Sequence, residues 1–209
     1  MSNLVQALDV KKLRQKTGAG FMDCKQALES CKNNFKEAEV WLKKKGLSVA
    51  AKKSDRKAAE GLVFSYIHGN GRMGVLLEVN SETDFVARNE NFKTFVKQLS
   101  LHISAMNPLY IKESDIPKDR LEKEKKIFQE QALAKAKKPE IAQRIVEGLY
   151  KKWLEEVCLL KQEFVRENQD NKQSIEEALN ELISVVGENI VIRRFVRFVL
   201  GETDEQKKS

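Results

Sequence analysis

The side chains of this 209-residue sequence that could do chemistry are few and are not grouped. There are two histidines, His68 and His102, and three cysteines, Cys24, Cys31 and Cys158. Zinc ligands occur at close, characteristic spacings that are missing here, so we expect no metal site. The sequence also offers no nucleophile with a matching base and orienting group, so we expect neither an enzyme nor a bound cofactor. We interpret His102 as a buried, hydrogen-bonded histidine, and Cys24 and Cys31 as small apolar packing residues.

A glycine-rich segment, Gly69–Gly74, fits the pattern G-x-G-x-x-G of dinucleotide-binding loops. That kind of site needs a strand before the loop and a helix after it, because the helix N-terminus holds the pyrophosphate. Here β-rich runs lie on both sides, LVFSYIH before the glycines and VLLEVN after them. The sequence therefore predicts a hairpin turn and no nucleotide site.

Two segments carry side chains that core packing does not explain. In the first, a glycine turn precedes Phe21 and Met22, and a methionine beside an aromatic residue at a loop–helix junction is typical of a docking surface. The alternative is that both side chains are buried under the third helix. In the second, Asp84 and Phe85 lie on the link between a strand and a long helix. There, Asp84 could simply cap the helix.

The net charge of +7 is concentrated at one end of the chain. Residues 1–58 carry a net charge of +8, and the remainder of the chain carries about −1. A basic segment of this kind suggests either docking on an acidic partner or a solvated lysine-rich surface. A ribosome- or RNA-binding module is the alternative function, but residues 43–57 lack the interleaved aromatic residues that would stack on bases.

The N-terminal domain, residues 1–46, is expected to contain three short helices, near 4–17, 21–31 and 35–45. Asn34 is the predicted cap of the third helix, and Gly46 its predicted end. A helical linker, residues 47–60, is expected to follow. The apolar residues expected to pack together are Val10, Leu13, Phe21, Ala27 and Leu28 against Phe35, Ala38, Val40 or Trp41, and Leu42.

The core domain, residues 61–201, changes to an extended pattern. We predict the hairpin, then a helix capped by Asn89, a helical hairpin at about 118–160 divided by Pro139, a helix ended by Gly187, and a third strand in 190–200. The helix after Asn89 places its apolar residues at helical spacing: Phe92, Phe95, Val96, Leu99 and Ile103. Residues 202–209 form a polar tail. The expected fold class is α+β and mostly helical, with a small antiparallel sheet packed with helices.

The two unexplained segments resemble the signatures of the elongation factor Ts family. The first signature, L-R-x-x-T-G-x-G followed by K-x-A-L, lies within residues 13–28, and the second, T-D-F-V-A-R-N, covers residues 83–89. The resemblance extends over nearly the whole chain, through Lys138-Pro139-Glu140 and Gly187-Glu188-Asn189 to Arg193-Arg194-Phe195. The chain is short by comparison with the longer members, which have a second subdomain and an inserted coiled coil.

The resemblance implies a guanine nucleotide exchange factor that promotes GDP release from elongation factor Tu during translation. It implies a ubiquitin-associated-like N-terminal domain that docks on the nucleotide-binding domain of that partner through Arg14, Phe21 and Met22. Phe85 would enter an apolar gap in the partner, and Asp84 would disturb the surroundings of its magnesium ion and phosphates. The expected partner-binding residues of the second segment are Thr83, Asp84, Phe85 and Val86.

The remaining expectations concern location and assembly. The sequence has no apolar run that would span a membrane and no visible signal or transit peptide, so we expect a cytoplasmic protein without membrane or direct nucleic-acid partners. The narrow sheet leaves strand edges and a partly apolar face. This favours burial of the sheet against another chain, either elongation factor Tu or a second copy of this protein, and we expect a homodimer formed through the sheet.

Overall fold

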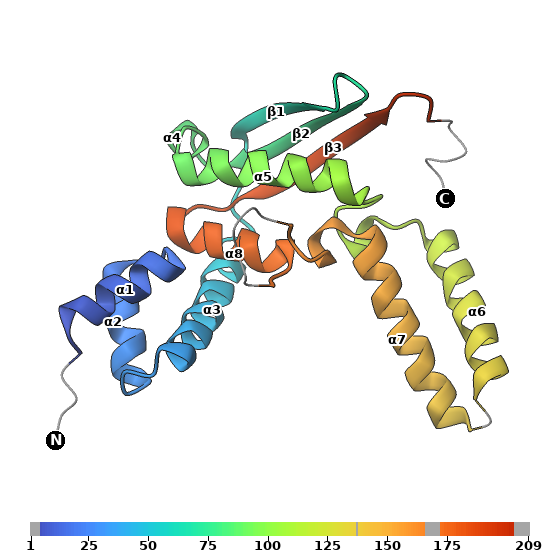
Figure 1. Cartoon of the computed structure of the whole chain (residues 1–209), viewed down its shortest axis with the longest axis horizontal. Coiled ribbons are helices and arrows are strands. Elements are labelled where there is room, and N and C mark those ends of the chain that lie inside the picture. Colours follow the sequence, from blue (N-terminus) through green and yellow to red (C-terminus); the bar gives the residue numbers. More distant parts are fainter. Residues whose placement is uncertain (1–4, 137, 166–171, 203–209) are drawn as a thin grey trace. The chain divides into compact units, whose positions relative to one another are not determined.

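The computed structural model describes residues 5–136, 138–165 and 172–202 (Figure 1). The chain is mostly helical with one small sheet, and the predicted α+β fold class is confirmed. The predicted polar tail lies, apart from Glu202, outside the described residues. In chain order, the helices and strands are α1 (Ala7–Thr17), α2 (Phe21–Ser30), α3 (Phe35–Ala51), β1 (Glu60–His68), β2 (Met73–Ser81), α4 (Asp84–Ala87), α5 (Glu90–Met106), α6 (Lys118–Lys135), α7 (Pro139–Val157), α8 (Ile175–Val186) and β3 (Val191–Val199).

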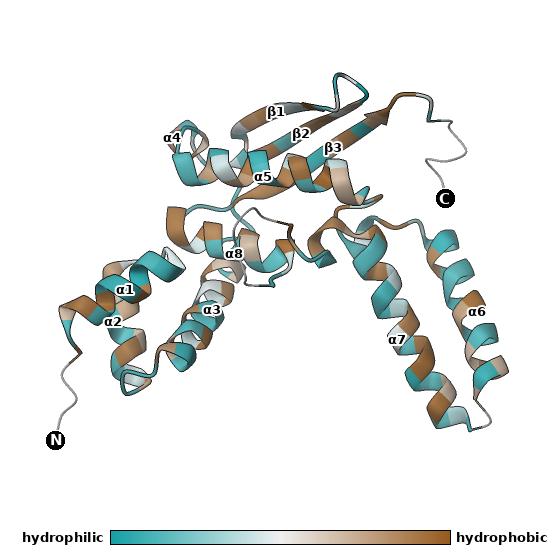
Figure 2. Cartoon of the chain, in the orientation of Figure 1, coloured by the Kyte–Doolittle hydropathy of each residue, from teal (hydrophilic) through white to brown (hydrophobic). Residues whose placement is uncertain are grey.

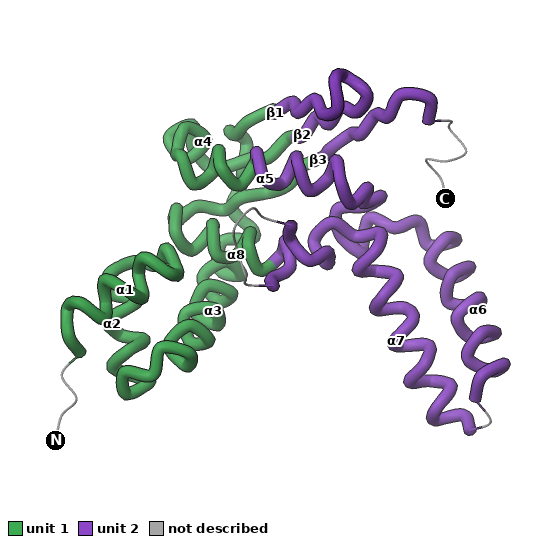
Figure 3. The backbone as a smooth tube through the Cα atoms, viewed as in Figure 1, with its two compact units in different colours: residues 1–63, 78–96, 177–193 green, residues 64–77, 97–176, 194–209 purple. Residues whose placement is uncertain are grey.

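The chain divides into two compact units that are interleaved in sequence (Figure 3). Unit 1 comprises residues 1–63, 78–96 and 177–193, and unit 2 comprises residues 64–77, 97–176 and 194–209. The three strands, α5 and α8 contribute residues to both units. The predicted domain boundaries, 1–46, 47–60 and 61–201, stay predictions.

In unit 1, the first three helices enclose their own small core, as the sequence predicts. Its buried residues are Val10, Leu13, Cys24, Ala27, Leu28 and Ala38, with Phe35, Trp41 and Leu42 partly buried against them. The expectation that Phe21 belongs to this core is wrong, because its side chain is 46% exposed. Of the two alternatives Val40 and Trp41, the structure selects Trp41.

The third helix confirms its predicted start and corrects its predicted end. Asn34 accepts hydrogen bonds from the backbone N–H groups of Lys36 and Glu37, at 3.1 and 3.3 Å. The helix then continues through Gly46 to Ala51, and turns take the place of the separate helix expected in the linker. Gly46 is a contact position: a Cβ atom there would lie 3.7 Å from the Cβ of Ser184. That distance is an ordinary van der Waals contact, so Gly46 is a buried position near α8, and local sequence cannot reveal this tertiary packing.

The sheet has the strand order β1-β2-β3, so the predicted hairpin and third strand are both confirmed. Three consecutive residues at the hairpin turn have positive φ, Gly69 at 59°, Asn70 at 56° and Gly71 at 84°. Two glycines and an asparagine are the residues that tolerate this conformation most readily. The glycine motif is therefore a turn between two strands, with no helix after it.

Helix α5 begins where the sequence predicts. The backbone N–H of Asn91 donates to Oδ1 of Asn89 at 2.8 Å, and every residue of the expected apolar stripe is buried. His102, on the same helix, is 1% exposed and hydrogen-bonded at both ring nitrogens, to Gln162 Oε1 at 2.8 Å and to the Val165 N–H at 3.2 Å. Burial lowers the pKa of His102, so the neutral ring is favoured.

Unit 2 contains the predicted helical hairpin, with α6 and α7 on either side of the expected break at Pro139. Colouring by hydropathy shows brown and teal segments alternating along α7, as an amphipathic helix requires (Figure 2). The buried residues of this hairpin and its base are Ile116, Phe128, Trp153, Leu154, Val157 and Cys158.

Candidate partner-binding site

The first candidate patch lies where α1 turns into α2. Phe21 and Met22 are the first two residues of α2 and are 46% and 68% exposed, and Arg14 on α1 is also exposed. The alternative that both apolar side chains are buried under the third helix is thus wrong. Neighbouring exposed aromatic and thioether groups form an adaptable apolar surface with a cation beside it.

The turn before this patch is fixed by local hydrogen bonds. Gly18 has φ of 69° and donates its N–H to the Arg14 carbonyl at 2.8 Å, which ends α1. The Thr17 hydroxyl donates to the Leu13 carbonyl at 2.8 Å. The turn lies near α8, since a Cβ atom on Gly18 would be 3.8 Å from Cγ2 of Val185. The patch therefore follows a hydrogen-bonded turn that lies near a second helix.

Ion pairs neutralise part of the basic charge around this patch. Lys45 Nζ lies 2.8 Å from Asp23 Oδ1, and Lys16 Nζ lies 2.6 Å from Glu39 Oε1. These partly exposed pairs contribute little stability. They do reduce the number of lysines in this region that face solvent without an acidic partner.

The second candidate patch is α4, a single helical turn. Phe85 is 79% exposed, whereas the next two residues, Val86 and Ala87, are 9% and 8% exposed. The side chain of Asp84 is 47% exposed and pairs with Arg88 at 2.9 Å. Asp84 is the first residue of α4, and Thr83 takes the N-cap position, so Asp84 is not a cap. The apolar ring and the carboxylate are presented together.

The structure separates the four expected binding residues of this segment into two kinds. Asp84 and Phe85 are accessible to a partner. Val86 is buried and anchors α4, and the polar groups of Thr83 are occupied within the chain. In this structure, Val86 and Thr83 hold the helix in place.

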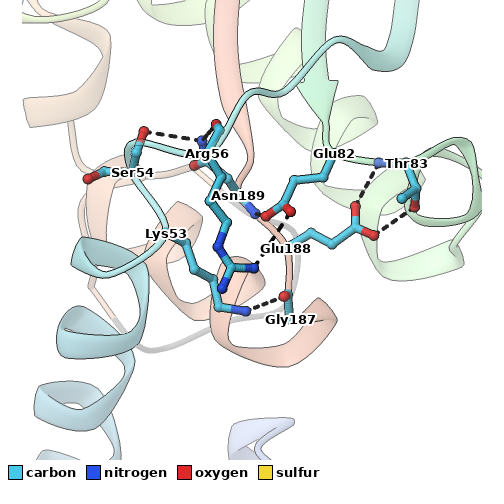
Figure 4. A network of polar contacts seen from close by, with 8 residues as sticks. All are labelled: Lys53, Ser54, Arg56, Glu82, Thr83, Gly187, Glu188 and Asn189. Carbon is cyan, nitrogen blue, oxygen red and sulfur yellow. Dashed lines mark hydrogen bonds and ion pairs between the residues drawn. The ribbon is translucent and has the colours of Figure 1, made fainter.

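A reciprocal pairing of two backbone segments fixes the start of α4 (Figure 4). The carboxylate of Glu188 accepts two hydrogen bonds from Thr83, from its N–H at 3.0 Å and from its hydroxyl at 2.6 Å. The carboxylate of Glu82 accepts the N–H of Asn189 at 2.6 Å. Glu188 thus binds the backbone of the residue that follows Glu82, and Glu82 binds the backbone of the residue that follows Glu188. We call these four residues the reciprocal pairing.

The same pairing holds the segment that follows α3. The Asn189 side-chain amide donates to the carbonyls of Arg56 at 2.7 Å and Ser54 at 3.3 Å, and Arg56 also lies 3.6 Å from the Glu82 carboxylate. Lys53 donates to the Gly187 carbonyl, where α8 ends (Figure 4). Three segments far apart in sequence are therefore joined within unit 1.

The C-terminal end of α8 is common to both patches. Val185 lies against the turn that presents Phe21 and Met22, and Glu188, three residues later, binds the residue before α4. All residues involved belong to unit 1. The expected partner-binding residues are thus two separate surface features supported by one helix end.

The described residues contain no group of three or more His, Cys, Asp or Glu that could hold a metal ion. Burial raises the pKa of the Cys24 thiol, and raises that of Cys158 to about 11, so neither is a reactive thiolate near neutral pH. In the part of the chain that the structure describes, no helix is long and apolar enough to cross a membrane.

Comparison with known proteins agrees with both signatures. The family model described as "Elongation factor TS" matches residues 47–179, and that described as "Elongation factor Ts, mitochondrial, N-terminal" matches residues 2–49. Elongation factor Ts of Acetivibrio thermocellus is 48% identical over 205 residues, covering 98% of this chain and 94% of its own length. Elongation factor Ts of Caldanaerobacter subterraneus subsp. tengcongensis is 51% identical over 203 residues, covering 97% of this chain and 100% of its own length.

The chain belongs to the elongation factor Ts family. The two relatives are matched over almost their entire length, so the short form is shared with other elongation factor Ts proteins. The segments that carry the family signatures are the two exposed patches described above.

Sequence reasoning missed the residues that position the second patch. Gly187-Glu188-Asn189 contributed to the resemblance, but no role was predicted for these residues, and Glu82 was passed over. Thr83 and Glu188 are 105 residues apart, so no local spacing links them. The sequence contains one weak signal. Gly187 alone suffices to end α8, so the end of the helix does not explain the two polar residues that follow it, Glu188 and Asn189.

Proposed function

We propose that this elongation factor Ts chain is a guanine nucleotide exchange factor that accelerates release of GDP from elongation factor Tu and also binds the nucleotide-free form. The observation that carries the proposal is the exposure of Phe85, 79%, beside the carboxylate of Asp84 on a fixed helical turn. A large apolar side chain held in water in this way favours insertion into a partner. Family membership supplies the partner.

Energetics indicate that α4 does not act alone. Burial of one phenyl side chain contributes about 1.5–3 kcal/mol. A thousandfold faster nucleotide release needs about 4 kcal/mol of barrier reduction. The difference has to come from binding elsewhere on the chain, which holds a partner conformation with low affinity for GDP.

The first patch is the proposed source of part of that binding energy. Phe21 and Met22 are apolar and exposed, and Arg14 adds a cation that suits an acidic partner surface. Because the turn is held by its own hydrogen bonds, little conformational entropy is lost when it docks. In this proposal, the first patch provides affinity and α4 acts on the nucleotide site.

The proposed activity involves no covalent step, no metal and no cofactor belonging to this chain. Exchange lowers the barrier to nucleotide release by conformational selection in the partner, so the factor is not an enzyme that transforms a substrate. We place this activity in the cytoplasm, where translation elongation occurs.

A binding module for RNA is the alternative, suggested by the charge of residues 1–58. Lys12, Lys16, Lys25 and Lys45 all pair with acidic side chains, which weakens that reading. Salt dependence separates the two functions. RNA binding falls steeply with ionic strength, because each neutralised phosphate releases counterions, whereas a largely apolar protein interface responds weakly.

We also propose that the chain forms a homodimer through the sheet. Several apolar side chains on the three strands and just after β3 are exposed: Val63, Ile67, Leu76, Val196, Phe198 and Leu200. A two-fold contact needs only one self-complementary patch, and such a contact would cover both this apolar surface and the strand edges.

The deciding experiment measures release of a fluorescent GDP analogue from purified elongation factor Tu, with and without this chain. The proposal predicts an accelerated release rate that saturates with factor concentration. A release rate that stays at the spontaneous value at every concentration would refute it. Repeating the titration at several salt concentrations distinguishes the protein partner from RNA.

A further inference from the structure

We propose that Glu188 is a positioning residue for nucleotide exchange, which holds α4 in the orientation that presents Asp84 and Phe85. This inference rests on the proposed function, since it assigns a role within the same site. Glu188 lies beyond the second family signature and contacts Thr83, the residue before α4. It acts through Thr83 and not on the partner.

Helix α4 has little means of holding its own position. It is four residues long, and a single turn forms too few hydrogen bonds to offset the entropy of ordering it. Its N-cap residue, Thr83, makes no side-chain cap hydrogen bond, and the pair between Asp84 and Arg88 is exposed to solvent. The orientation of α4 therefore depends on the surrounding structure.

Thr83 is held by a set of contacts from outside the helix. Its N–H and its hydroxyl both donate to the Glu188 carboxylate, at 3.0 and 2.6 Å, and its carbonyl accepts the Ser81 hydroxyl at 2.8 Å. The hydroxyl that would ordinarily cap the helix is thus directed to Glu188 instead. Hydrogen bonds to an ionised acceptor are about twice as strong as neutral ones, so Glu188 is the principal restraint on this residue.

The backbone that carries Glu188 is itself fixed on both sides. Gly187 is in the left-handed region, with φ of 78°, and its carbonyl accepts a hydrogen bond from Lys53. Asn189 is buried, and its N–H donates to Glu82. The carboxylate is therefore held on a rigid loop, which is what a positioning group requires.

The chemistry of the site suits a carboxylate at position 188. Both groups that Thr83 directs to it are donors here, and an ionised carboxylate has two accepting oxygens and no donor. A glutamine of nearly the same shape has one accepting oxygen for the Thr83 N–H, and its NH₂ group faces the hydroxyl, which stays bonded only by turning to accept. Glu188→Gln therefore removes the charge from both hydrogen bonds and reverses the one at the hydroxyl, while leaving volume and packing nearly unchanged.

Kinetics of GDP release from elongation factor Tu test this role. For Glu188→Gln we expect the saturating release rate to fall roughly tenfold, with half-saturation nearly unchanged because the first patch is intact. Glu176→Gln is the matched control, since Glu176 is an acidic residue of α8 that pairs with Lys161 and has no contact with Thr83 among the hydrogen bonds and ion pairs described. An unchanged saturating rate in Glu188→Gln, or a change confined to half-saturation, would overturn the assignment.

A second pair of variants tests whether Glu188 acts through Thr83. Thr83→Val removes the hydroxyl donor, and Thr83→Ser keeps it. We expect Thr83→Val to lower the rate in the wild-type background but to add less in the Glu188→Gln background, because the charge-assisted hydrogen bond at the hydroxyl is already lost there. Thr83→Ser should retain most of the rate. Fully additive losses would contradict the proposal.

Amide hydrogen exchange of the free chain gives a readout that does not depend on the proposed function. We expect Glu188→Gln to accelerate exchange of the N–H groups of residues 87–89 roughly tenfold, while those of α5 beyond its first turn remain unchanged. If the wild-type chain fails to accelerate GDP release from elongation factor Tu but this local effect appears, the exchange function is wrong and the positioning of α4 stands. If protection of residues 87–89 is unaffected, Glu188 does not position α4.

Discussion

Replacement of Phe85 by alanine should separate folding from function. The ring is 79% exposed in the free chain, so most of its apolar surface is available for burial in a partner. Full burial of a phenylalanine side chain contributes about 1.5–3 kcal/mol. If the transition state for GDP release uses all of that energy, Phe85→Ala lowers the release rate at limiting factor concentration by about ten- to 150-fold.

The same exposure predicts that folding is almost unaffected. An exposed side chain away from the core changes the free energy of unfolding by about 0.5 kcal/mol or less. Val86 and Ala87, which anchor α4, are retained in the variant. Urea unfolding of Phe85→Ala should therefore overlay that of the wild type, while stopped-flow measurement of GDP release shows the loss.

A matched control removes an equally exposed apolar residue elsewhere. Leu133 on α6 is 69% exposed, and Leu133→Ala should leave both GDP release and stability nearly unchanged. Normal release by Phe85→Ala, or an equal loss in Leu133→Ala, would refute the assignment of Phe85. A variant that unfolds at much lower urea concentration would show that the ring supports the fold.

The remaining predictions concern docking, assembly, backbone conformation and pH. Replacing Phe21 and Met22 by alanine should raise the factor concentration at half-saturation with recovery of the full release rate at high concentration; a rate that stays low at saturation would contradict a docking role. Light scattering after size-exclusion chromatography should give the mass of a dimer at micromolar concentration, and a mass of 24.0 kDa at all concentrations would exclude it. Gly61→Ala should destabilise the chain by about 3 kcal/mol in urea unfolding. The reason is that φ of Gly61 is 141° and a Cβ atom there would meet the Val79 carbonyl oxygen. Unchanged stability would show that the strand can shift to make room. Burial lowers the pKa of His102 below its ordinary value of 6.5, so the unfolded chain takes up a proton more readily than the folded chain. The free energy of unfolding should therefore be constant well above pH 6.5 and fall as the pH drops through and below that value. In His102→Gln the part of this pH dependence that comes from His102 should vanish.

Most of the fold could be predicted from the sequence because its signals are local. Pro139 between two helical patterns, Asn89 before an apolar stripe and glycines between two β-rich runs each determine structure within a few residues. The errors have a common origin. Gly46 has the local context of a helix end, but α3 continues through it and the residue is buried near α8, which only tertiary structure shows.

The candidate site was predictable in part for the same reason. The resemblance marks both segments, and the place of Phe85 on a link between a strand and a helix favours its exposure, whereas the apolar pattern also assigns Phe21 to the local core and the structure exposes it. Val86 lies in the same signature, yet it is buried, because a signature does not distinguish the residues that contact a partner from those that support them. Thr83 and Glu188, 105 residues apart, meet only after the chain has folded.

Two neighbouring apolar residues of α4 differ in exposure because of the orientation of this helix: Val86 is buried and Phe85 is exposed. Successive residues of an α-helix are about 100° apart around its axis. Phe85 is 79% exposed and Val86 is 9% exposed, so rotation of this single turn by about one residue would move the ring of Phe85 into the buried position of Val86. Burial of the ring is favoured by the hydrophobic effect, and the rotated state therefore competes with the observed one. The reciprocal pairing opposes that rotation by fixing Thr83 at its N–H and hydroxyl, and so keeps the ring of Phe85 available to a partner.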